Sequence, residues 1–303
     1  MPSTKVILLV VLGLVAAAYA FLWYAAAGAA ANRCRPGRYA LFVGFVTNFF
    51  DALGVGSFAT TTALYRLQRT VADEHLPGTL NVGHCLPTVV QAFVFVSIVE
   101  VDERTLIFMI LAGILGAWLG AGIVTRLSRR AIQAGLGTAL LAAAALMFVR
   151  LIGFVPGGGD ALALNGSRLA IGMSGNFVFG GLMMIGVGAY APIMIMVSLL
   201  GMNPKTAFPI MMGSCAFLTP VGSLRFLRAG NYDLAAAVGL TLGGIPAVLI
   251  AAFLIRELPL DAVRWAVIAI ALVTALGLLR DALKSKSAAS ASSPAAVPTF
   301  ANL

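Results

Sequence analysis

Charged residues are scarce in this sequence. Asp, Glu, Lys and Arg make up only 10% of its 303 residues, whereas soluble domains carry roughly 25%. Hydrophobic residues make up 60%, and the mean hydropathy is +0.99. These values exclude a soluble globular domain and favour a polytopic helical membrane protein. A transmembrane β-barrel is excluded too, because barrel strands alternate in polarity and the long runs here are apolar on all faces.

Cysteine and histidine are also few, which limits disulfide and metal chemistry. Cys34, Cys85 and Cys215 have no paired spacing that would predict a disulfide or a zinc site. The two histidines, His75 and His84, do not stand at a ligand spacing. We therefore expect neither a metal nor a cofactor.

No enzyme signature is present. The glycine runs at 157–159 and 186–188 do not follow a soluble strand, so they are not nucleotide-binding loops. No Ser/His/Asp arrangement and no carboxylate pair is visible. The net charge of +9 does not indicate nucleic acid, because Lys and Arg stand at the ends of apolar segments, where they set topology and meet anionic lipid headgroups. Membrane lipids are therefore expected partners, and the protein is not expected to be an enzyme.

Nine apolar segments approach the ~20 residues that a membrane-spanning helix needs. The first could be read as a secretory signal peptide, but its apolar stretch continues to about Ala31 and favours a retained transmembrane helix. Residues 285–303 are rich in Ala, Ser and Pro and predict a disordered tail. The segments cover approximately 5–31, 39–65, 80–100, 105–125, 131–153, 170–200, 206–224, 234–255 and 262–280.

One phrase occurs twice. Residues 54–59 read GVGSFA and residues 186–191 read GVGAYA, an offset of 132 residues that Pro77 and Pro209 also keep. Each phrase interrupts an apolar run with glycines. Exposed backbone groups are tolerated in hydrocarbon only where they line a cavity or a ligand. Matching glycine breaks in two halves therefore point to the substrate site of a transporter.

The charge pattern predicts the topology. Basic loops at 33–38, 126–130, 225–228 and 280–286 should all be cytoplasmic. They fall on one side only if 39–65 and 170–200 each enter and return on the same side. Each half then has one hairpin and three crossings, and this odd number inverts the second half. The N-terminus should lie outside and the C-terminus inside, with about seven full crossings.

The expected fold class is all-α, a polytopic helical membrane protein with two inverted structural repeats, each containing a Gly-broken re-entrant helix hairpin. The expected divisions are an extra N-terminal transmembrane helix with a cytoplasmic basic loop (1–38), repeat 1 (39–153), an external linker (154–169), repeat 2 (170–284) and the disordered tail (285–303).

Polar residues gather around the first break. Asp51 stands three residues before Gly54 inside an apolar segment, and intramembrane ionisable residues are functional candidates, although a hydrogen-bonded structural role is an alternative. Ser57 and Thr60 open the arm that follows the glycines. Helix-start N–H groups and hydroxyls suit a small oxyanion, and the same hydroxyls could also cap the arm. The matching positions of the second half offer little beyond backbone, so we expect a chemically lopsided site.

Two further side chains lie downstream. Asn81 can both donate and accept hydrogen bonds, and His84 can change charge near neutral pH or serve as a hydrogen-bonded structural group. Asp51 and His84 are the candidates for proton coupling. The predicted substrate-binding residues are Gly54, Gly56, Ser57, Thr60, Asn81, Gly186, Gly188 and Tyr190.

The stretch 44–64, extended by 73–84, resembles the signature of the TauE/SafE family of sulfite and organosulfonate exporters. The second phrase, with residues 200–207, resembles the repeat of that family, and the resemblance covers about residues 40–280. It implies a carrier in a prokaryotic-type plasma (inner) membrane for small sulfur-containing anions, such as sulfite or sulfoacetate. We expect this carrier to export its substrate. Because sulfite has a second ionisation near neutral pH, we also hypothesise proton coupling.

Two alternatives stay open beside this carrier. One is an uncoupled anion channel, and the other is an importer of a related anion such as thiosulfate. Relatives that import thiosulfate use cysteines along their path, and Cys85 adjoins the motif while Cys215 lies in the second half. A coupled carrier should need Asp51 or His84 to load a proton, whereas a channel should tolerate their neutralisation.

Overall fold

The structure is a computed structural model that describes residues 4–28, 30, 34–53, 55–154, 159–186, 188–254 and 260–291. Within these residues it contains eleven α-helices and two short 3₁₀ helices, and the β-structure is limited to one isolated bridge between Ala161 and Met202. The all-α expectation is therefore confirmed for the described part of the chain.

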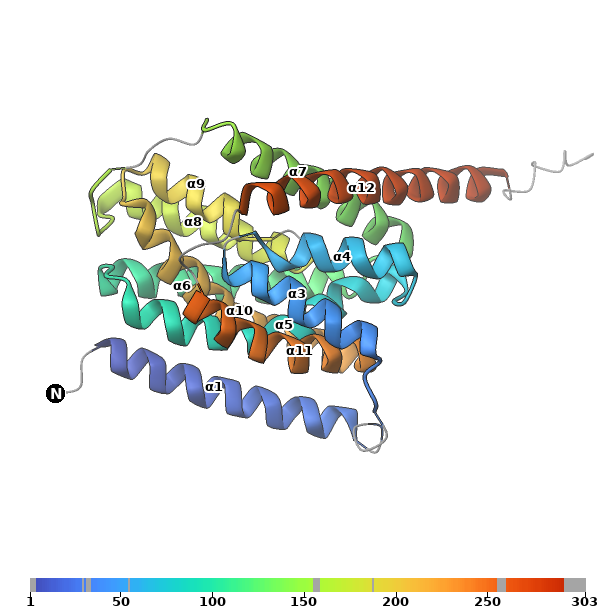
Figure 1. Cartoon of the computed structure of the whole chain (residues 1–303), viewed down its shortest axis with the longest axis horizontal. Helices are drawn as coiled ribbons and strands as arrows, with labels where there is room; N and C mark the ends of the chain where they lie inside the picture. The colour runs from blue at the N-terminus through green and yellow to red at the C-terminus, as the bar shows by residue number, and fades with distance from the viewer. Residues whose placement is uncertain are drawn as a thin grey trace, which may run out of the picture.

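The two halves have the same order of elements (Figure 1). After the N-terminal helix α1 (Thr4–Ala27), each half contains two short helices, a 3₁₀ turn and three long helices. In the first half these are α3 (Arg38–Ala52), α4 (Ser57–Gln68), η1 (Asp73–His75), α5 (Leu76–Ile98), α6 (Glu103–Val124) and α7 (Arg129–Leu151). In the second half they are α8 (Gly166–Met183), α9 (Tyr190–Leu199), η2 (Pro204–Thr206), α10 (Ala207–Ala229), α11 (Leu234–Leu254) and α12 (Leu260–Ala291).

Six helices in the described residues are long and apolar enough to cross a membrane, namely α1, α5, α6, α7, α10 and α11. The protein is thus a multi-pass membrane protein, and all six helices are among the crossings that the charge pattern predicts. The remaining predicted crossing, 262–280, falls in α12, whose side chains are described only in part. Helix α12 continues to Ala291, past the predicted start of the tail at 285, and residues 292–303 lie outside the described residues.

The short helices form two bent pairs. In Figure 1, α4 turns back toward the end of the molecule where α3 begins, and α9 turns back toward the opposite end. The turns depend on glycine, because Gly56 has φ +92° and Gly186 has φ +117°, values that residues with a side chain rarely adopt. Gly54 lies outside the described residues.

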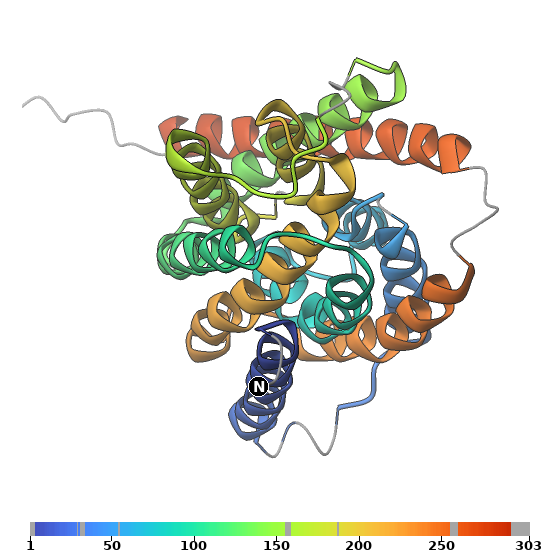
Figure 2. The ribbon, with the colours of Figure 1, turned by 90° about the vertical axis from the view of Figure 1, so that its left-hand side faces the viewer.

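Helices α5 and α10 form the centre of the molecule. They pack against each other, and they are the most buried of the six long apolar helices. Helix α1 is the least buried of the six and lies at the rim in the end-on view of Figure 2. Each bent pair also touches one central helix, since α4 contacts α5 and α9 contacts α10. The two glycine breaks are thereby placed inside protein.

The halves are interleaved. Helix α3 packs mainly against α11, α8 packs mainly against α6, and α7 packs along α12. Glycines allow this close approach, as small residues do between membrane helices. A Cβ atom at Gly243 of α11 would overlap the carbonyl of Leu41, and a Cβ atom at Gly116 of α6 would overlap the carbonyl of Phe177. The first helix of each bent pair is therefore held by the other half.

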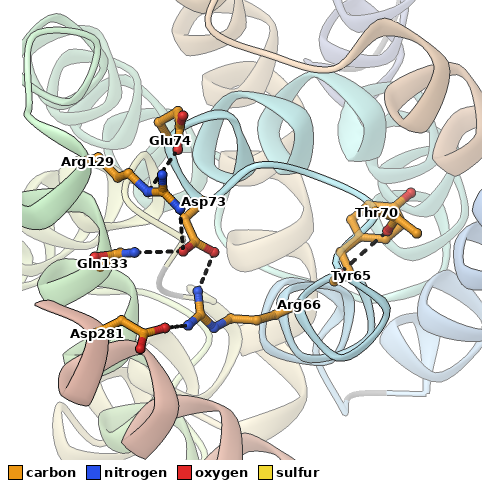
Figure 3. A network of polar contacts seen from close by, with 8 residues as sticks. All are labelled: Tyr65, Arg66, Thr70, Asp73, Glu74, Arg129, Gln133 and Asp281. Atoms are coloured by element: carbon orange, nitrogen blue, oxygen red, sulfur yellow. Dashed lines mark hydrogen bonds and ion pairs between the residues drawn. The ribbon is translucent and has the colours of Figure 1, made fainter. Parts of the chain in front are cut away.

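A polar network ties the far end of α4 to its surroundings (Figure 3). Arg66 of α4 forms ion pairs with Asp73 of η1 and with Asp281 of α12. Gln133 of α7 donates a hydrogen bond to Asp73 over 2.7 Å. Because the network joins four elements from both halves, it fixes the end of the first bent pair that lies farthest from its glycine break.

The arrangement leads to a test of topology. In a background without the native cysteines, Ser167→Cys, at the exposed start of α8, should react with a membrane-impermeant thiol reagent from outside. Ser128→Cys, in the exposed turn between α6 and α7, should react only after permeabilisation, because the charge pattern predicts that the basic loops face the cytoplasm. Labelling of position 167 from the cytoplasmic side alone would overturn this topology.

Candidate functional site

A small cavity of about 30 Å³ lies where the two glycine breaks meet. Gly56 and Ser57 reach it from the first break, and Gly188 and Ala189 reach it from the second. Side chains of α3, α5, α8 and α10 complete the wall. The structure therefore brings together two segments that are 132 residues apart in the chain.

The cavity wall differs between the two halves of the chain. The first half supplies oxygen- and nitrogen-bearing side chains, and the second half supplies mainly sulfur. Methionine is unbranched and polarizable, so it adapts to an irregular occupant. The expected lopsided chemistry is present in the wall, which consists of Asp51, Ser57, Phe58, Thr88 and Gln91 from the first half and Met183, Met211, Met212 and Cys215 from the second, beside the glycines and Ala189.

Asp51 is the acidic residue of this wall. It stands in the last turn of α3, and the Nε2 atom of Gln91 donates a hydrogen bond to its Oδ2 atom over 2.9 Å. Its carboxylate is also close enough to the amide and hydroxyl of Ser57 to interact with both. Among the described residues no cation forms a salt bridge with it. Asp51 thus has hydrogen-bond donors around it but no neutralising charge from the described part of the chain.

His84 lies one layer behind the cavity. Its Nδ1 atom is 3.0 Å from Oδ1 of Asn48 in α3, and its Nε2 atom is 2.9 Å from the hydroxyl of Thr61 in α4. The amide nitrogen of Asn48 donates to the carbonyl of Gly44, which leaves Oδ1 to accept from Nδ1–H. A neutral ring then accepts from Thr61. The ring of Phe58 stacks on His84 at 5.6 Å and itself reaches the cavity.

Asn81 and Thr60 lie away from the cavity wall. The amide of Asn81 donates to the carbonyls of Met183 and Met184, at 3.5 and 3.4 Å. These carbonyls are at the end of α8, where a helix leaves acceptors unpaired, so Asn81 holds the second break against α5. The hydroxyl of Thr60 donates to the carbonyl of Ser57 over 2.8 Å and is therefore turned onto its own helix.

Of the glycines predicted for the site, some line the cavity and others do not. Gly56 and Gly188 line the cavity, and neither has any atom near the position of a Cβ. Gly186 makes the turn of the second break, where a Cβ would press on the side chain of Leu136. Gly54 and the side chain of Tyr190 lie outside the described residues.

Thr88 and Gln91 line the cavity but were not selected from the sequence as site residues. With His84 they follow the spacing i, i+4, i+7 on α5, which places three polar side chains on one face of an apolar helix. This stripe is the signal that could have identified them. In the described part of the chain, His, Cys, Asp and Glu form no group of three that could hold a metal ion.

Comparison with known proteins gives one match. Residues 1–147 match the family model described as Sulfite exporter TauE/SafE. The match runs from α1 through most of α7, so it includes the first break, Asp51 and the polar stripe of α5. No curated protein and no solved structure matches the chain.

The contacts of His84 lead to a stability test with neighbouring threonines. Thr61→Val removes the partner of the buried Nε2 atom and should destabilise the protein by about 1–3 kcal/mol, the usual effect of an unpaired buried polar group. Thr60→Val breaks only a bond within its own helix, and we expect a loss below about 1 kcal/mol. Unfolding in detergent measures both variants. Equal losses would show that the His84 contact is not holding the bent pair.

Proposed function

We propose that this chain, whose residues 1–147 match the TauE/SafE family model, is a member of that family and a secondary transporter of small sulfur-containing anions such as sulfite or sulfoacetate. It exports these anions across a prokaryotic-type plasma membrane, and anion binding and release are linked to protonation of the site. The observation that carries the proposal is the meeting of the two glycine breaks at one cavity beside Asp51. Transporters with broken helices bind their substrates at such meeting points.

The contacts of the two halves support an inverted-repeat architecture. The pair α3–α11 corresponds to the pair α8–α6, and α4–α12 corresponds to α9–α7. Single side chains correspond as well. Asn48 of α3 bonds to His84 of α5, and Asn176 of α8 donates to Ser214 of α10 over 2.9 Å. In this architecture α3–α4 and α8–α9 are re-entrant hairpins that enter from opposite membrane surfaces.

The backbone at the breaks suits an anion. Helix α4 begins at Ser57 after Gly56, helix α9 begins after Ala189, and neither N-cap side chain bonds to the helix. Uncapped helix starts present N–H donors and the positive end of the helix dipole. With two such starts at one cavity, a small oxyanion can be bound by backbone groups of both halves. Ser57 and Gln91 add side-chain donors to this site.

Asp51 supplies the proton coupling in this mechanism. As a carboxylate, Asp51 competes with the substrate for the donors of Ser57 and Gln91 and repels an anion. As a neutral acid it releases these donors, and the neutral form is favoured because no cation of the described residues pairs with the carboxylate. Protonation therefore favours anion binding and deprotonation favours release. His84 has both ring nitrogens engaged with Asn48 and Thr61, so in this proposal it positions the hairpin.

The coupling can be tested with Asp51→Asn in proteoliposomes. Asparagine resembles the neutral acid, so anion binding should be retained while the pH dependence of transport is lost. The measurement is the flux of labelled sulfite, sulfoacetate, thiosulfate and sulfate under an imposed pH gradient. Asp102→Asn is the matched control, because Asp102 caps α6 away from the cavity and asparagine caps a helix equally well. Unchanged pH dependence in Asp51→Asn would assign Asp51 a structural role and leave an uncoupled pathway.

The position of the site can be tested by filling the cavity. Gly188 lines it and has no atom near the position of a Cβ, so Gly188→Val should fold but reduce flux of every transported anion by at least about tenfold. That loss corresponds to roughly 1.4 kcal/mol in the barrier. Gly277→Val in α12 is the control, because a Cβ atom at Gly277 also meets no neighbouring atom and Gly277 does not line this cavity. Full flux in Gly188→Val would place the substrate path outside this cavity.

A further inference from the structure

Two hollows that share Val221 lie along α6 and α10, and we refer to them together as the groove. The first has a volume of about 570 Å³, and its lining includes Trp118, Val221, Leu224 and three arginines, Arg126, Arg225 and Arg228. A second hollow of about 380 Å³ adjoins it between α1, α6 and α10. Only hydrophobic side chains line this second part, among them Ile114 and Phe217, and Val221 belongs to both parts. The groove is therefore basic at one end and apolar along the rest.

The basic end has no counter-charge from the described residues. None of the three arginines forms a salt bridge there, and the buried Nε atom of Arg225 has no hydrogen-bond partner in the described part of the chain. Three guanidinium groups at one end of a groove repel one another unless an anion lies between them. Arginine also bonds phosphate through paired N–H groups.

Arg225 is held in a fixed position. Its guanidinium lies over the ring of Trp118, 4.3 Å from the ring centroid. Gly122 of α6 leaves the space for it, because a Cβ atom at that position would overlap the guanidinium. A cation above an aromatic face is stabilised by the ring. The groove thus contains a preformed cationic group instead of a freely moving surface side chain.

We propose that this groove binds an anionic phospholipid of the membrane leaflet at the basic end of the bundle. The phosphate lies among Arg126, Arg225 and Arg228, and an acyl chain extends along Trp118 and Val221 toward Ile114. From position 126 to position 114 a helix rises by ~18 Å, close to half of a hydrocarbon core of ~30 Å. The length, the apolar lining and the charged end together fit a phospholipid better than a free inorganic anion, which would need only the arginines.

The test uses the full-length protein in detergent, with phosphatidylglycerol as the probe. Native mass spectrometry or equilibrium binding compares wild type with Arg225→Gln and Arg228→Gln. Each substitution should weaken phosphatidylglycerol binding about fivefold, the effect expected for one basic residue near an anionic headgroup. Arg228 is exposed, so its variant should fold even if Arg225→Gln does not. Arg35→Gln is the control, because Arg35 is an exposed arginine outside the groove and its loss should leave binding unchanged.

Competition distinguishes a lipid from a free anion. Inorganic phosphate and glycerol phosphate should fail to displace phosphatidylglycerol, and phosphatidylcholine should bind more weakly than phosphatidylglycerol. Gly122→Ala keeps all charges but displaces Arg225, and it should also weaken binding. Equal weakening by Arg35→Gln, equal binding of phosphatidylcholine, or displacement by inorganic phosphate would each overturn the proposal. None of these binding measurements depends on anion flux through the cavity at the glycine breaks.

Discussion

Backbone polar groups without partners are the constraint on which this structure depends. A helix that stops inside an apolar layer leaves N–H and C=O groups that lipid cannot satisfy. Here both interruptions are enclosed by protein, since α5 and α10 lie at the centre and the two bent pairs pack against them. Asn81 illustrates how the enclosure works, because its amide bonds to two carbonyls at the end of α8. The N–H groups at the starts of α4 and α9, where no N-cap side chain bonds to the helix, are the ones that the proposed function assigns to an anion.

Much of the fold could be predicted because membrane helices follow simple rules. Apolar length gives the long helices, and six of them are found in the described residues. The glycine phrases locate the turns, where Gly56 and Gly186 adopt positive φ. The pairing of helices could not be read in the same way. An apolar helix shows no polar face to orient it, so the packing of α3 on α11 depends on glycines such as Gly44 and Gly243, whose importance appears only in three dimensions.

Of the residues predicted for the site, some line one cavity and others do not. Asp51, Gly56, Ser57 and Gly188 line the same cavity, because each is adjacent to a break. Three other predicted residues face elsewhere. Thr60 bonds to its own helix, and Asn81 and His84 bond to neighbouring segments. Side chains of this kind are equally suited to a ligand and to a backbone carbonyl. The choice between these partners depends on the rotation of each helix, which hydrophobicity alone does not fix.

Helices of each half pack mainly against helices of the other half, and this arrangement has a consequence for biosynthesis. When residues 1–151 have been made, α3 and α6 still lack α11 and α8, the helices against which they pack most extensively, and α7 lacks α12. The packing of these helices can therefore be completed only after the second half of the chain has been made. During that interval the interrupted backbone between α3 and α4 is without its final neighbours. The family match of residues 1–147 therefore ends before the helices against which α3, α6 and α7 pack most extensively.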